Sequence, residues 1–132
     1  PELECKVGLL TCFPGMSADL CVPQIENPQN KALILLSFGS GNAPNHRWLL
    51  EALARLIERG VPVINVSQCS AGEVAMAKYD AGKVFQDIGV IGASDMLLEA
   101  ALTKTMHLLG QGLEGEAFVD AFRANLKGEL SD

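Results

Sequence analysis

The chain has 132 residues, of which 48% are hydrophobic and 20% charged, so it can bury one ordinary domain core but not two. Ten basic and sixteen acidic residues give a net charge of −6, and the absence of a basic cluster argues against a nucleic-acid partner. No apolar run reaches the roughly 20 residues of a membrane span, and the first residues lack the pattern of a signal peptide. We therefore expect one soluble, cytoplasmic domain without membrane association.

The cysteines and histidines show no spacing typical of a metal site. The four cysteines are Cys5, Cys12, Cys21 and Cys69, and the two histidines are His46 and His107. None of the cysteines forms a CxxC pair, and neither histidine lies near a thiol pattern that would bind zinc. We expect no metal and no cofactor, and interpret the cysteines as buried free thiols. A ligand contact is the alternative for Cys69, which lies in a loop.

The first predicted elements are a strand over residues 7–13 and a short helix that Ser17 caps and that runs through Cys21. Residues 23–30 read as a loop, with an Asn-Pro turn signal. Residues 32–38 start with a continuous apolar run, which is typical of a strand covered by helices on both faces.

A helix that Asn45 is positioned to cap and a strand over residues 61–66 follow. The helix carries one apolar stripe and ends at Gly60. The stripe consists of Leu49, Ala52, Leu53 and Leu56. This spacing predicts a helix packed against a sheet.

The second half of the chain continues the alternation. Residues 73–78 favour a helical turn, residues 88–93 a short strand, and Ser94 is positioned to cap a helix that ends at Gly110. Residues 116–126 suit a last amphipathic helix, followed by a frayed polar tail. Strands that alternate with helices predict an α/β domain of three layers, α/β/α, with a parallel sheet of about four strands like flavodoxin or Rossmann folds.

Two strand ends pass into loops of small polar residues, at residues 37–44 and 67–72. Ligands bind at the carboxyl ends of strands in open α/β sheets, so these loops predict a site for a small polar molecule. Pro44 stands where a dinucleotide fingerprint needs its third glycine, and the chain has neither a P-loop nor a nucleophile elbow. The sequence contains no self-contained catalytic triad.

An ordered series of motifs then resembles the C-terminal domain of cytoplasmic, type I L-asparaginases. The motifs are Phe13-Pro14-Gly15-Met16, Phe38-Gly39-Ser40-Gly41-Asn42-Ala43-Pro44, Ser67-Gln68-Cys69-Ser70-Ala71-Gly72, Tyr79 with Gly82, Gly89-Val90-Ile91-Gly92, Asp95-Met96 and Glu99-Ala100-Ala101-Leu102-Thr103-Lys104. Each motif is weak alone, but their order along nearly the whole chain is specific. The resemblance implies an amidohydrolase that converts L-asparagine to L-aspartate and ammonia.

The resemblance also implies that residues 1–132 are one domain of a longer enzyme. The family's nucleophilic threonine lies in a larger N-terminal catalytic domain, whose Thr-Gly-Gly-Thr and Gly-Thr-Asp motifs are absent from this chain. The chain opens at Pro1 rather than at a methionine, which fits a piece of a longer protein. We expect no catalytic residue in this chain and no activity from it alone.

In the family, this domain completes the active site of a neighbouring subunit, and the matching positions are Asn42 and Tyr79. An amide and a phenol can hydrogen-bond a substrate's ammonium and carboxylate. A turn amide and a core-edge aromatic are the structural alternatives. The resemblance further implies an effector site in the loop of Ser67, Gln68 and Cys69. Where bacterial members carry a carboxylate-binding arginine, this chain has Leu36, which puts effector binding in doubt.

The implied partners are L-asparagine, the N-terminal catalytic domain and further copies of the protein in a dimer or tetramer. One alternative is a non-catalytic module that senses asparagine or mediates oligomerisation. Another is a related amidohydrolase, either the amidotransferase subunit that releases ammonia from glutamine or the lysophospholipase-type asparaginase of animals. The sequence does not distinguish an asparagine from a glutamine preference.

Overall fold

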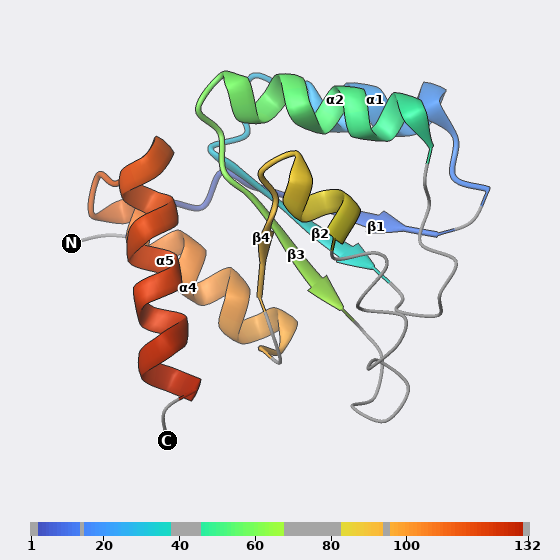
Figure 1. Ribbon diagram of the computed structural model, residues 1–132. Helices are drawn as coiled ribbons and strands as arrows, with labels where there is room; N and C mark the ends of the chain where they lie inside the picture. The colour runs from blue at the N-terminus through green and yellow to red at the C-terminus, as the bar shows by residue number, and fades with distance from the viewer. Residues whose placement is uncertain (1–2, 14, 38–45, 68–82, 94–95, 131–132) are drawn as a thin grey trace.

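Four parallel strands in sequential order form the centre of the molecule (Figure 1). The computed structural model describes residues 3–13, 15–37, 46–67, 83–93 and 96–130 of the chain. The strands are β1 (Val7–Cys12), β2 (Ala32–Ser37), β3 (Val63–Ser67) and β4 (Ile91–Gly92). All three neighbouring pairs run parallel, as the alternation of strands and helices predicts.

Strand β2 is buried along its whole length. Successive side chains of a strand point to opposite faces of the sheet, and both faces of β2 meet a core. Leu33 and Leu35 belong to one apolar cluster, and Ile34 and Leu36 belong to the other. The unbroken apolar sequence of β2 therefore reflects its place between two layers of helices.

Helices cover both faces of the sheet and make the three layers that the sequence predicts (Figure 1). Helices α1 (Ala18–Ile25) and α2 (Arg47–Glu58) pack on the first apolar cluster. Helices α4 (Leu98–Gly110) and α5 (Gly115–Leu130) cover the second. The predicted α2 stripe is buried at all four positions, Leu49, Ala52, Leu53 and Leu56.

Several predicted helix ends are wrong. Helix α1 continues through Pro23 to Ile25, because Cys21 and Ile25, one turn apart, are both buried against the sheet. His46, rather than Asn45, is the N-cap of α2. Leu97, rather than Ser94, is the N-cap of α4, and the backbone N–H of Met96, which precedes the helix, bonds the carbonyl of Ala93 at 3.1 Å.

The ends of the chain's last elements also differ from the prediction. Strand β4 has two residues instead of six, since Gly89, with φ +101°, still belongs to the turn that precedes it. Helix α5 reaches Leu130 instead of ending in a frayed tail. A further short helical segment covers residues 83–87, whereas the turn predicted over residues 73–78 lies outside the described residues.

The thiol prediction holds for two of the three cysteines that the structure describes. Cys12 and Cys21 are buried and free, whereas Cys5 is exposed, because it precedes β1 rather than belonging to it. Within the described segments, no cluster of histidine, cysteine and carboxylate side chains could hold a metal ion. A search of the same segments finds no helix with the length and apolar character of a membrane span.

Candidate functional site at the carboxyl ends of the strands

The carboxyl ends of β2 and β3 lie side by side, at the edge of the sheet where ligands bind in open α/β folds. Ser37 and Ser67, the last residues of the two strands, are partners in the register. Cys12, the last residue of β1, is in turn the partner of Ser37. The arrowheads of these strands point to one side of the molecule in Figure 1. The two polar strand ends predicted from the sequence therefore meet.

A side-chain hydrogen bond joins the two strand ends. The hydroxyl of Ser37 donates to Oδ1 of Asn65 at 2.8 Å. Ser37 is only 2% exposed, and Asn65 is partly buried. Among the described residues no other hydrogen bond is made by the Asn65 side chain, whose Nδ2 is a donor group.

This polar pair faces the α1 and α2 layer. Ser37 lies two residues after Leu35 in β2, so both side chains are on the same face of the sheet. Asn65 is the register partner of Leu35 and therefore shares this face, where Leu35 packs in the first apolar cluster. Cys12 belongs to the same cluster. Burial raises the pKa of its thiol to about 12, and the neighbouring Cys21 adds to the rise. Cys12 is thus a neutral thiol at physiological pH and does not supply a nucleophile.

Leu36 lies on the opposite face of the sheet from this pair. Its side chain is 8% exposed and packs in the second apolar cluster, under α4 and α5. An arginine at this position would have to carry its guanidinium out of that apolar layer to bind a carboxylate.

The two histidines differ in their surroundings. His46 stacks on Trp48 with ring centroids 5.5 Å apart, and its Nε2 is buried without a hydrogen-bond partner in the described parts of the chain. His107 is exposed in the last turn of α4, where its Nε2 lies 3.3 Å from Nε2 of Gln111. Neither histidine hydrogen-bonds a serine hydroxyl within those parts, so the structure contains no serine–histidine pair there.

Of the five predicted site residues, the structure places Ser67. It is the partly buried last residue of β3, next to Ser37. Asn42, Tyr79, Gln68 and Cys69 lie outside the described residues. Their substrate-binding and effector-binding roles remain predictions.

Sequence reasoning did not assign a site role to Asn65. A polar residue inside the apolar run of residues 61–66 was the available signal, since a buried amide needs a hydrogen-bond partner. The partner, Ser37, is 28 positions away in sequence. Only the parallel register of β2 and β3 brings the two together.

The fold is a three-layer α/β domain. Its polar residues Ser37, Asn65 and Ser67 lie at the carboxyl ends of the strands, where ligands bind in open α/β sheets. Residues 6–122 match the family model of the Glutaminase/Asparaginase C-terminal domain, so the chain belongs to this family. L-asparaginase 1 of Escherichia coli is 43% identical over 95% of this chain and 37% of its own length. The human 60 kDa lysophospholipase is 38% identical over 98% of this chain and 22% of its own length.

A solved structure agrees with the sequence relationship. The crystal structure of L-asparaginase I from Vibrio cholerae superposes with a TM-score of 0.76 and 40% identity, covering 96% of this chain and 36% of that one. The chain therefore spans little more than a third of these two L-asparaginases. The family resemblance and the α/β fold predicted from the sequence are both confirmed.

Proposed function

We infer that this chain is the C-terminal domain of an L-asparaginase that hydrolyses L-asparagine to L-aspartate and ammonia. The observation that carries the proposal is the family match over residues 6–122, with 43% identity to the Escherichia coli enzyme. The reaction is assigned to the whole protein, because the chain spans 37% of that relative.

The proposed role of the domain is to recognise the substrate rather than to attack it. The described side chains at the strand ends, Ser37, Asn65 and Ser67, are polar and uncharged, and Cys12 beside them is a neutral thiol. Such groups donate and accept hydrogen bonds without supplying an activated nucleophile. We assign the chemistry to an N-terminal domain, and substrate contacts in a neighbouring subunit to Asn42 and Tyr79.

The same proposal includes an oligomer, a dimer or a tetramer, in which the domain supports assembly. It places the whole protein in the cytoplasm, as the resemblance to the type I branch implies. Ser67, Gln68 and Cys69 are proposed to contact an amino-acid effector. No cofactor and no metal enter the reaction.

The test is ammonia release by the purified 132-residue chain. We expect it to fold, as measured by circular dichroism, and to release no ammonia from L-asparagine or L-glutamine. The full-length protein should release ammonia from L-asparagine under the same conditions. Turnover by the chain alone, with contaminating enzyme excluded, would contradict the division of roles between two domains.

A second candidate function is supported by the similarity to the human 60 kDa lysophospholipase. The full-length protein would then release a fatty acid from a lysophospholipid. Comparing ammonia release with fatty-acid release by one preparation separates the two activities. If the protein binds L-asparagine but shows neither activity, a sensing or oligomerisation module is favoured. If it releases ammonia from L-glutamine but not from L-asparagine, the amidotransferase subunit is favoured.

A further inference from the structure

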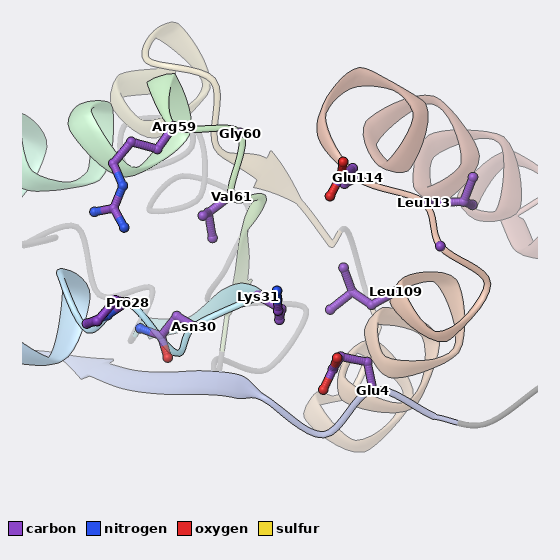
Figure 2. Close-up of a pocket in the computed structure, with 11 residues that line it drawn as sticks. Glu4, Pro28, Asn30, Lys31, Arg59, Gly60, Val61, Leu109, Leu113 and Glu114 are labelled. Carbon is purple, nitrogen blue, oxygen red and sulfur yellow. The ribbon is translucent and has the colours of Figure 1, made fainter.

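A hollow lies at the opposite end of the sheet from the candidate site. It has a volume of about 330 Å³ and collects residues from separate segments at the amino ends of the strands (Figure 2). Glu4 precedes β1, Lys31 precedes β2, and Arg59 and Val61 precede β3. Leu109 of α4 and Glu114, just before α5, close the other side. We call this cavity the amino-end hollow.

Backbone hydrogen bonds hold the walls of the amino-end hollow in place. The N–H of Glu4 bonds the carbonyl of Met106 at 3.1 Å, and that of Lys31 bonds the carbonyl of Lys6 at 2.8 Å. The N–H of Arg59 bonds the carbonyl of Leu56 at 3.1 Å. Since two of the walls are tied to α4 and α2 and a third is tied to the segment that precedes β1, the cavity is formed without a ligand, as most small-molecule sites are.

Two cations at this hollow have no carboxylate partner in the described segments. Lys31 and Arg59 form no ion pair there, whereas Arg55, one turn earlier on α2, pairs with Glu26 at 3.1 Å. The hollow also carries two carboxylates, Glu4 and Glu114. The four charged groups sum to zero, which distinguishes the hollow from a simple anion site.

The opposite charges occupy different sides of the hollow. Figure 2 shows Arg59 on the side of α2, Glu4 and Glu114 on the side of α4 and α5, and Lys31 between them. Leu109 and Val61 add apolar surface between the charged groups. A ligand that fits this arrangement carries both an anionic and a cationic group and little bulk between them.

We propose that the amino-end hollow binds a free α-amino acid. Its carboxylate contacts Arg59 and Lys31, and its ammonium group contacts Glu4 and Glu114. The proposal does not depend on the proposed asparagine hydrolysis, since every residue in it lies at the other end of the sheet from Ser37 and Ser67. Because Lys31, Arg59 and Glu114 are solvent-exposed and Glu4 is only partly buried, binding is weak and decreases as salt rises.

The test is a nuclear magnetic resonance titration of the 132-residue chain at low salt, with each probe added to about 50 mM. The probes are glycine, L-aspartate, L-asparagine, succinate, which lacks the ammonium group, and 1,4-diaminobutane, which lacks carboxylates. We expect glycine, L-aspartate and L-asparagine to shift the backbone amides of Gly60 and Val61. Succinate and 1,4-diaminobutane should bind more weakly than L-aspartate.

Three variants locate the binding. Arg59→Gln should weaken binding of L-aspartate about fivefold or more, because it removes a charge-assisted contact at an exposed site. Glu114→Gln should weaken the binding of L-aspartate, because it removes a contact to the ammonium group. It should strengthen the binding of succinate, because it removes a carboxylate that repels this dianion. Arg55→Gln is the matched control, a cation of the same helix outside the hollow, and should leave binding unchanged. Circular dichroism checks that each variant is folded.

Absence of shifts at Gly60 and Val61, succinate binding as tightly as L-aspartate, or equal effects of Arg55→Gln and Arg59→Gln would each overturn the proposal. Shifts confined to Ser37 and Asn65 would overturn it as well and would support the proposed substrate edge instead. Failure of asparagine hydrolysis in the full-length protein would leave the hollow's binding data unaffected.

Discussion

The hydroxyl of Ser37 donates a 2.8 Å hydrogen bond to Oδ1 of Asn65, and this bond links the carboxyl ends of β2 and β3. Both strands lead into the loops that the sequence singles out as a ligand site. Because Ser37 is 2% exposed, water cannot readily replace it as the donor. The bond therefore contributes both to stability and to the relative position of the two strand ends.

Ser37→Ala should lower the free energy of unfolding by about 1 to 2 kcal/mol, because Oδ1 of Asn65 loses its buried donor. Urea unfolding of the 132-residue chain measures the change. Ser17→Ala is the control, since Ser17 is the exposed N-cap of α1 and its side chain makes no capping hydrogen bond. It should change stability by less than about 0.5 kcal/mol. Equal losses in the two variants would count against the assigned bond.

The sequence predicts correctly those elements whose pattern depends only on their own residues. The apolar run of β2 and the stripe of α2 need only their own residues, and both are buried as predicted. Helix α1 passes the predicted end at Cys21 because Ile25 finds a buried place against the sheet, which outweighs the poor fit of Pro23. Such tertiary packing is not visible in a local pattern.

The candidate site shows the same limit. Polar strand ends were predictable from the loops' composition, and the register that pairs Ser37 with Ser67 confirms that they are neighbours. The role of Asn65 was not predictable, because its partner is distant in sequence. The sequence does not predict the amino-end hollow for the same reason, since Lys31, Arg59 and Glu114 come from segments that only the fold brings together.

Thr105→Val should stabilise the domain by about 1 kcal/mol. Thr105 is fully buried in α4, and its hydroxyl has no hydrogen-bond partner in the described parts of the chain. Valine has nearly the same shape and removes the cost of the buried, unpaired hydroxyl. Thermal and urea unfolding measure the gain. Thr103→Val, at an exposed position of the same helix, should have little effect, and a loss of stability in Thr105→Val would show that the hydroxyl is satisfied in solution.

The stability that Cys12 contributes should decrease as the pH rises above about 9. Burial raises the pKa of its thiol from 9.0 to about 12 in the folded state. A raised folded-state pKa means that the contribution is complete below the unfolded pKa and is lost as the pH approaches the folded one. Between pH 8 and pH 10 the stability difference between wild type and Cys12→Ala should therefore fall by about 1 kcal/mol. Other titrating groups cancel in the difference, and a constant difference would show that the thiol titrates normally.

Asn42→Ala and Tyr79→Phe in the full-length protein should each lower kcat/KM for L-asparagine about tenfold to a hundredfold, because each removes a proposed hydrogen bond to substrate. The melting temperature should hardly change. Leu20→Ala, at an exposed position of α1, serves as a control for both measurements. A sharp fall in melting temperature with an unchanged rate per folded enzyme would instead make Asn42 and Tyr79 structural residues.

The identity of residue 36 leads to a kinetic prediction. A bidentate arginine combines charge with two aligned hydrogen bonds, whereas Leu36 offers neither and packs at 8% exposure beneath α4 and α5. Loss of one charge-assisted bond costs about 1.5 to 3 kcal/mol, which would weaken binding of the proposed effector from the submillimolar range to the order of 10 mM. For the proposed hydrolysis by the full-length protein, we expect a hyperbolic rather than sigmoidal dependence of rate on L-asparagine.

Leu36→Arg should move that dependence toward a sigmoidal curve. It should also lower the melting temperature, because the guanidinium must leave an apolar layer. Leu36→Lys is the matched control, since it places a charge in the same layer without the forked geometry of arginine, and we expect it to remain hyperbolic. A sigmoidal curve in the unmodified enzyme, abolished by Cys69→Ala, would show that the loop of Ser67, Gln68 and Cys69 binds the effector without an arginine.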